Sequence, residues 1–131
     1  MFILEHLWII MALPLAGSML TLLAGRHWPK KYVNLSSVGF VVLAFLSYCE
    51  LVREFFALPA SQIPWIPPAY FTWMTAGPFH VNFALQVDQL TIVMLGVVTF
   101  VGMLIHIYSI GYMAHEDGYY RFFAEMNLFM F

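Results

Sequence analysis

His106 is the one ionisable side chain that lies well inside a long apolar stretch of this sequence. An imidazole changes charge near neutral pH, so His106 could pass protons from group to group. As a neutral ring it could instead hydrogen-bond a neighbouring helix or a buried water. A relay needs a chain of groups, and this stretch offers no second one. A buried polar contact is therefore the simpler role for His106, and a proton relay is the alternative.

The residues around His106 indicate which way it faces. At 100° per residue, the small and hydroxyl-bearing residues of this stretch fall within an arc of roughly 80° on a helix. They are Thr91, Thr99, Gly102, His106 and Ser109. Membrane helices use such stripes to approach one another and to exchange hydrogen bonds. We therefore expect the stripe to face protein or a water-filled cavity.

The remaining charged side chains indicate structural roles. Asp88 stands two residues before the apolar run that holds His106, where a carboxylate can cap a helix N-terminus. Glu125 can pair with Arg121 near the start of the last run. Three charged residues form a local cluster at the end of the second run: Glu50, Arg53 and Glu54.

No catalytic constellation is present in the sequence. It has no phosphate-binding glycine loop, no nucleophile elbow and no pair of ligands at metal spacing. The sequence therefore predicts no catalytic residue, no cofactor site and no metal site in this chain. No basic patch suggests binding to nucleic acid.

The elements that position these side chains are apolar helices. Hydrophobic residues make up 63% of the 131 and charged residues 9%, with a mean hydropathy of +0.83, whereas soluble domains are about 45–50% apolar and about 25% charged. Three runs, 7–25, 32–49 and 90–114, are long enough to cross a hydrocarbon layer of ~30 Å. A fourth run occupies 122–131. We expect an all-α membrane protein with three transmembrane helices and the start of a fourth, over about 3–25, 32–57, 89–113 and 122–131.

The segment between the second and third helices reads differently. Prolines interrupt it, and from Phe79 to Leu85 apolar residues alternate with polar ones after the Gly77–Pro78 pair. Alternation of period two beside such a turn is typical of a β-hairpin. The sequence predicts a short hairpin over about 70–86, in an outer loop.

The positions of lysine and arginine indicate the orientation. Of the five basic residues, Arg26, Lys30 and Lys31 follow the first helix and Arg121 follows the third. The positive-inside rule places 26–31 and 115–121 in the cytoplasm or its organellar equivalent. The N-terminus and residues 58–86 are then expected outside.

From the third helix onward the sequence resembles a known family. The segments VDQLT at 87–91, LIHIYSIGYM at 104–113, RFFA at 121–124 and NLF at 127–129 are similar to the N-terminal part of the large antiporter-like membrane subunit of respiratory complex I. In bacteria this is subunit L of NADH–quinone oxidoreductase. The resemblance is specific over about 80–131, and over the first two helices it rests on topology and spacing. Glu125 departs from it, since an aromatic or neutral residue is expected there.

The resemblance implies a long helical subunit in the bacterial inner membrane or an equivalent energy-transducing membrane. This subunit helps to move protons while other subunits oxidise NADH and reduce quinone. Its partners would be other membrane-arm subunits, the rest of its own subunit and lipid. The family's acidic and lysine residues of the proton path lie on helices beyond the fourth, so none of them is expected here. Residues 1–131 would be a single N-terminal segment that supports the pump, with the outer hairpin placed against a neighbouring subunit.

Alternatives remain for the whole protein. The family's subunit is several times longer, so we expect this chain to be a fragment, a split-gene product or part of a longer sequence. A related multisubunit cation/proton antiporter or a membrane-bound hydrogenase-type complex is one rival assignment. A small membrane scaffold or assembly protein without transport activity is another.

Overall fold

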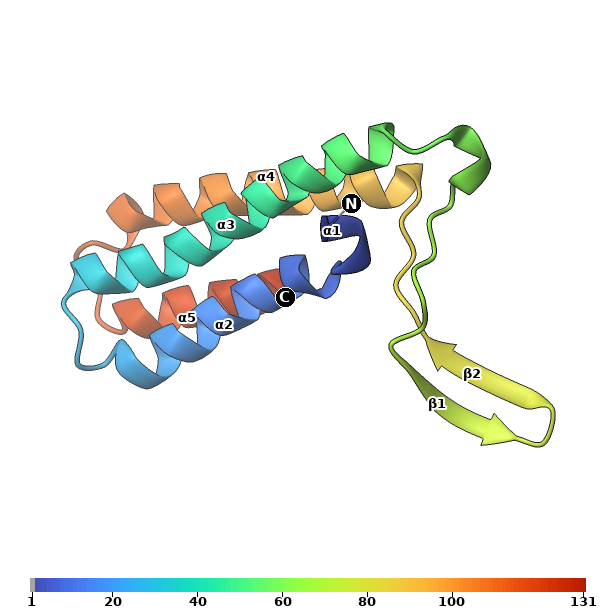
Figure 1. Cartoon of the computed structure of the whole chain (residues 1–131). Coiled ribbons are helices and arrows are strands. Elements are labelled where there is room, and N and C mark those ends of the chain that lie inside the picture. Colours follow the sequence, from blue (N-terminus) through green and yellow to red (C-terminus); the bar gives the residue numbers. More distant parts are fainter. Residues whose placement is uncertain (1) are drawn as a thin grey trace.

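Helices α2, α3, α4 and α5 lie side by side, and a two-stranded hairpin projects from one end of them (Figure 1). The computed structural model describes residues 2–131. Its elements, in chain order, are α1 (Phe2–Glu5), α2 (Trp8–Ala24), α3 (Lys30–Phe56), the 3₁₀ turn η1 (Ala60–Gln62), β1 (Phe71–Ala76), β2 (Phe79–Phe83), α4 (Gln89–Tyr112) and α5 (Tyr119–Met130). The mostly helical architecture with one hairpin confirms the predicted class of secondary structure.

Two of the described helices are long and apolar enough to cross a membrane. They are α3, with 27 residues and a mean hydropathy of 1.9 in its most apolar window, and α4, with 24 residues and 2.4. Only 22% and 17% of the residues in those windows are buried within the protein. Most residues in these windows therefore keep part of their surface outside the core of the bundle, as residues do on helices solvated by lipid. α2 is also apolar but shorter, with 17 residues.

The first helix differs from the continuous segment expected over 3–25. A four-residue helix, α1, ends at Glu5, and α2 begins at Trp8. The break is not at Pro14, because α2 continues through that proline. It follows Leu4, which is fully buried in an apolar cluster at this end of the bundle. No helix-breaking residue lies between α1 and α2. Instead, α1 contacts the end of α3.

The last helix begins three residues earlier than the apolar run suggested. Gly118 adopts a φ of 80° and immediately precedes Tyr119, the first residue of α5. A positive φ is inexpensive for glycine, so the turn can end there. Arg121 falls inside the helix but is exposed, and long basic side chains can reach the polar interface from the end of an apolar helix.

The hairpin has the turn that the sequence predicted. β1 and β2 are antiparallel, with Ala76 opposite Phe79, so Gly77 and Pro78 form the connection. Gly77 has a φ of 60°, which a side chain would disfavour. A bulge lies between Thr72 and Met74. Nearly all hairpin side chains are exposed, so the bundle covers neither face of it.

Both short interhelical loops lie at the end of the bundle opposite the hairpin and α1 (Figure 1). These loops connect α2 to α3 and α4 to α5. Arg26 and Lys30 are therefore at the same end as the start of α5, while Arg53 is at the other. We call these the basic end and the hairpin end of the bundle.

Candidate functional site

Three of the five residues in the small and polar stripe of α4 are buried in the protein, and the other two, Thr91 and Gly102, are half-buried. Thr99, His106 and Ser109 are 3%, 1% and 3% exposed. The Thr99 hydroxyl donates to the Leu95 carbonyl one turn earlier, at 2.7 Å. The Ser109 hydroxyl lies 3.8 Å from the Met126 sulfur of α5. The stripe thus lies along the neighbouring helices rather than toward lipid.

His106 is held from within its own helix. Its Nδ1 lies 2.7 Å from the Gly102 carbonyl oxygen, which can only accept, so Nδ1 carries the hydrogen. Its Nε2 is buried and has no hydrogen-bond partner among residues 2–131. The ring lies beside Phe123 of α5, with ring centroids 6.3 Å apart. In a neutral imidazole this nitrogen is an acceptor, and here it has no partner in an apolar setting.

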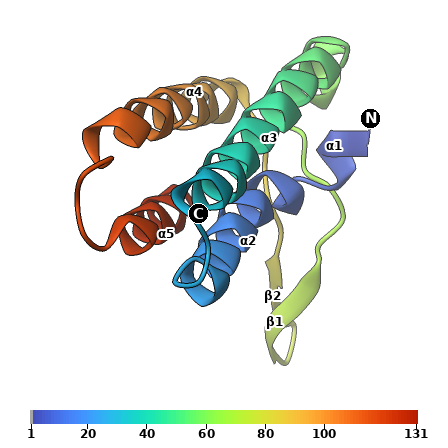
Figure 2. The ribbon, with the colours of Figure 1, turned by 90° about the vertical axis from the view of Figure 1, so that its left-hand side faces the viewer.

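A hollow of about 330 Å³ lies between α4 and α5 at His106. In Figure 2 the ribbons of these two helices lie apart from each other. Apart from His106, the residues that line the hollow are apolar or glycine. No second titratable side chain lines it within the described chain, so the hollow does not bring a relay partner to His106.

A second set of polar contacts, which no sequence pattern predicted, joins α5 to α3. The side-chain amide of Asn127 donates to the Ser37 hydroxyl and, at 3.0 Å, to the Phe123 carbonyl. Asn127 and Ser37 are fully buried. The available signal was the presence of a hydroxyl in the run 32–49 and of an amide in the run 122–131.

Two more polar pairs lie closer to the basic end. The Thr21 and Ser36 hydroxyls are 3.1 Å apart and join α2 to α3. The Tyr119 hydroxyl donates to the Asn34 side chain at 2.5 Å and joins α5 to α3. Hydrogen bonds of this kind bring apolar helices together where burial alone gives no preference for one neighbour.

Gly17 of α2 allows the close approach of α3 and α5. A Cβ atom at this position would lie 2.9 Å from the Phe40 Cβ and 3.2 Å from the Asn127 Oδ1. The first distance is shorter than real Cβ atoms adopt. Gly17 is therefore the position at which α2 meets both partners without room for a side chain.

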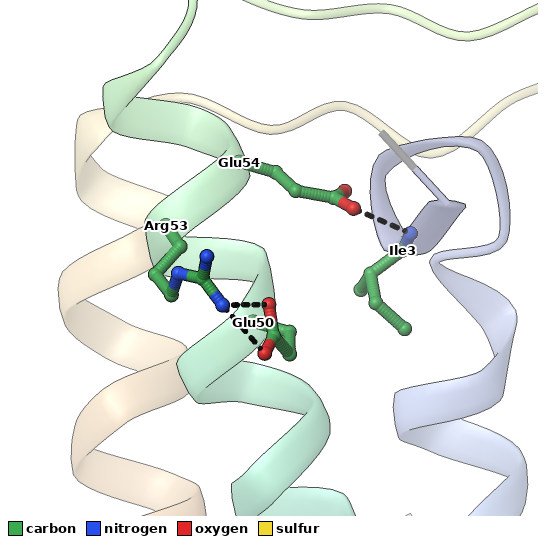
Figure 3. A network of polar contacts seen from close by, with 4 residues as sticks. All are labelled: Ile3, Glu50, Arg53 and Glu54. Atoms are coloured by element: carbon green, nitrogen blue, oxygen red, sulfur yellow. Dashed lines mark hydrogen bonds and ion pairs between the residues drawn. The ribbon is translucent and has the colours of Figure 1, made fainter.

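At the hairpin end, polar contacts attach α1 to the rest of the bundle (Figure 3). The Glu54 carboxylate accepts from the backbone N–H groups of Ile3 and Leu4, at 3.3 and 2.9 Å. The Trp65 indole donates to the Leu4 carbonyl at 3.3 Å. The backbone around the buried Leu4 is thus bound from both α3 and the outer loop.

The charged side chains of Glu50 and Arg53, close to Glu54 on α3, are exposed. Arg53 pairs with Glu50 at 2.9 Å on the surface of α3 (Figure 3). Glu125 is exposed, and the described residues do not include an Arg121–Glu125 ion pair. Exposed pairs of this kind contribute little to stability, typically about 0–1 kcal/mol.

Asp88 is the N-cap residue of α4. Its Oδ1 accepts from the Thr91 backbone N–H at 2.7 Å and from the Thr91 hydroxyl at 2.8 Å. These hydrogen bonds hold the pKa of Asp88 below its usual range, with the backbone bond the larger cause. The residue before it, Val87, exchanges two backbone hydrogen bonds of 2.9 Å with Trp65. The start of α4 is therefore fixed next to the base of the hairpin.

We predict that the Asp88 cap is independent of pH throughout the neutral and mildly acidic range. A carboxylate whose pKa is lowered on folding stabilises the protein above its unfolded pKa, about 3.9, and loses that contribution only as pH falls through the lower folded value. Hydrogen exchange of the amides at 89–92 should show constant protection from pH 7 to about 4.5, after correction for the intrinsic rate. Asp88→Ala should expose these amides at pH 7, whereas Asp88→Asn keeps an acceptor and most of the protection. A loss of protection between pH 7 and 5 in the unmodified protein would contradict this assignment.

The basic end has its own contacts. The Lys30 ammonium donates to the Ala114 carbonyl and lies 5.1 Å from the centre of the Tyr119 ring. The start of α3 is thereby joined to the α4–α5 loop. Among residues 2–131, no group of three His, Cys, Asp or Glu side chains is arranged to hold a metal ion.

Comparisons with known proteins give a consistent result. Residues 73–123 match the family model described as NADH-ubiquinone oxidoreductase (complex I), chain 5 N-terminus. The chain is similar to NADH-quinone oxidoreductase subunit L of Escherichia coli strain K12, with 41% identity over 118 residues, covering 90% of this chain and 19% of that protein. It is also similar to subunit L of Pseudomonas aeruginosa, with 40% identity over 122 residues, covering 89% of this chain and 19% of that protein.

A chloroplast protein is similar to almost the same extent. It is the NAD(P)H-quinone oxidoreductase subunit 5 of Mesostigma viride, with 35% identity over 134 residues, covering 95% of this chain and 19% of that protein. The chain thus spans about a fifth of the length of these relatives. The apolar helices and the relatives together indicate a membrane location. Residues 73–123 thus match the N-terminal domain of chain 5 of complex I, and about nine tenths of the chain are similar to NADH–quinone oxidoreductase subunit L.

Proposed function

We propose that this chain forms the first helices of a proton-translocating membrane-arm subunit of NADH–quinone oxidoreductase. The observation that carries the proposal is the similarity to subunit L over about nine tenths of the chain. The chain's own side chains suit a supporting role, because its buried polar groups hydrogen-bond between helices or within them. The electron-transfer reaction would belong to other subunits of the complex.

The proposed topology has three crossings, with the N-terminus outside and the basic end inside. α2 has 17 residues, which rise about 26 Å at 1.5 Å per residue and nearly match a hydrocarbon layer of ~30 Å. Arg26, Lys30 and Lys31 precede or begin α3, and Arg121 lies near the start of α5 at the same end of the bundle. The positive-inside rule assigns this end to the cytoplasm of a bacterium or its organellar equivalent. The membrane would be the bacterial inner membrane or an equivalent energy-transducing membrane.

The proposed partners are other membrane-arm subunits, the rest of the same subunit and lipid. The hairpin supports the first of these, since it projects from the bundle with large exposed apolar side chains, among them Trp73 at 75%, Phe79 at 60% and Phe71 at 55%. Exposed apolar groups of this size commonly mark protein–protein contacts. We propose that the hairpin contacts a neighbouring subunit.

We propose that His106 acts as a buried polar contact and not as a proton relay, and that Asp88 positions α4 against the base of the hairpin. For His106 the support is its bond to the Gly102 carbonyl and the apolar lining of the adjacent hollow. For Asp88 it is the pair of bonds with Thr91.

Native electrophoresis of gently solubilised membranes tests the proposed function. An epitope-tagged chain, expressed at its native level, should migrate in a very large assembly that reduces a dye with NADH as the electron donor. An identical lane stained without NADH controls for dye reduction by other reductases. Migration as a small free species would support a scaffold or assembly protein instead, and a large assembly without NADH dehydrogenase activity would support a cation/proton antiporter or hydrogenase-type complex.

A further inference from the structure

We infer that the outward face of α3 near the basic end binds an anionic phospholipid. A groove of about 710 Å³ runs along this face. Lys31, Tyr32 and Asn34 line one end of it, and apolar residues of α3, together with Ile110 of α4, line the remainder. A cation beside an elongated apolar groove has the chemistry needed for a negatively charged headgroup and its acyl chain.

The length of the groove fits one leaflet of a bilayer. Its lining residues on α3 extend from Lys31 to Leu43, a rise of about 18 Å along the helix. Half of a hydrocarbon layer of ~30 Å is about 15 Å. An acyl chain that entered beside Lys31 would therefore end near the far end of the groove.

Gly39 lines the groove and contributes no side chain to it. A Cβ atom at this position would meet no heavy atom within 4 Å. Gly39 is therefore not required for contact between helices, in contrast to Gly17. The neighbouring side chain of Leu35 is 71% exposed, so this apolar face has no cover from the described residues.

The charge at the groove is free to bind an anion. Lys31 is exposed and forms no hydrogen bond or ion pair with residues 2–131, whereas the adjacent Lys30 is used by Ala114 and Tyr119. No carboxylate lines the groove. Tyr32, 56% exposed, adds an amphipathic ring of the kind that settles at headgroup level. Basic pockets next to membrane helices are known sites for anionic headgroups.

Photolabelling of the assembled complex tests this inference. The complex is reconstituted into vesicles that contain a trace of phosphatidylglycerol with a photoreactive diazirine in its acyl chain, and adducts are located by peptide mass spectrometry. We expect adducts within 35–43, which excess phosphatidylglycerol removes and neither phosphatidylcholine nor inorganic phosphate removes. Lys31→Gln should lower the labelling about fivefold, the effect of one basic residue near an anionic surface. Gly39→Leu should lower it further by filling the groove.

Two matched variants serve as controls. Arg53→Gln removes a cation at the hairpin end, and Gly111→Leu makes the same change of size at an open glycine of α4 that does not line the groove. Both should label as the unmodified complex does. Equal labelling by a phosphatidylcholine probe would overturn the inference in favour of bulk lipid, and adducts that persist in Lys31→Gln and Gly39→Leu would overturn it too. Absence of adducts in 35–43 would also overturn the inference, because protein would then cover this face. NADH-driven proton uptake by the same vesicles tests the proposed function separately, because the inference rests on the membrane location alone.

Discussion

Replacing Gly17 with leucine is expected to remove most of this subunit from the assembled complex. Even a Cβ atom would lie 2.9 Å from Phe40 of α3 and 3.2 Å from the Asn127 side chain of α5, so a leucine must push α2 away from two helices at once. Overpacking one well-packed contact typically costs about 1–3 kcal/mol. The displacement would also disturb the hydrogen bond between Asn127 and Ser37, which lies in the same layer of the bundle.

The measurement is the fraction of tagged subunit that migrates with the complex, together with the thermal midpoint of the solubilised complex. Gly111→Leu is the control, because a side chain there meets open space while the gain in helix propensity, about 1 kcal/mol, is the same. We expect the control to assemble normally. Normal assembly of Gly17→Leu with an unchanged midpoint would show that α2 does not pack against α3 and α5 in this way.

An apolar substitution at His106 is expected to have little effect, whereas a charged one is expected to disrupt assembly. His106→Leu should leave NADH-driven proton uptake within about twofold of normal, because it removes an acceptor, Nε2, that has no partner among the described residues; such a group costs about 1–3 kcal/mol when buried. The Gly102 carbonyl can keep its helical bond to the backbone N–H at 106. His106→Asp should disrupt assembly, since a carboxylate in the centre of a membrane helix costs about 2.5–3.5 kcal/mol or more.

Both variants are measured as NADH-driven proton uptake per assembled complex, so that loss of assembly is separated from loss of transport. His106→Asn is an intermediate control, which keeps polarity without an imidazole. If His106→Leu assembled fully but pumped at a small fraction of the normal rate, His106 would be a relay element and the buried-contact assignment would be wrong.

Much of the fold could be predicted because its signals are local. The Gly77–Pro78 pair and the alternation after it predicted the hairpin, and the structure places the turn at those residues. The stripe of α4 followed from helical periodicity alone, and its residues at 99, 106 and 109 are buried. These features depend on neighbours in sequence, which a pattern can describe.

The features that could not be predicted depend on which helices meet. Asn127 and Ser37 are 90 residues apart, and nothing in either run shows that one faces the other. The break between α1 and α2 is similar, because Glu54 reaches Ile3 and Leu4 from the far end of α3. The apolar run that begins at Phe122 predicts a fourth helix over 122–131. The structure includes Arg121 in α5, since an exposed arginine at a helix end can reach water.

The central claim is that this chain is part of a proton-translocating NADH–quinone oxidoreductase. It is tested most directly by NADH-driven proton uptake into inverted membrane vesicles from cells that lack residues 1–131 of the subunit, with and without the intact gene restored. We predict that uptake driven by this complex is lost with the segment and returns with the restored gene, in sodium-free buffer. Uptake that persists at the normal rate without the segment, or that returns only as sodium-dependent exchange, would contradict the claim.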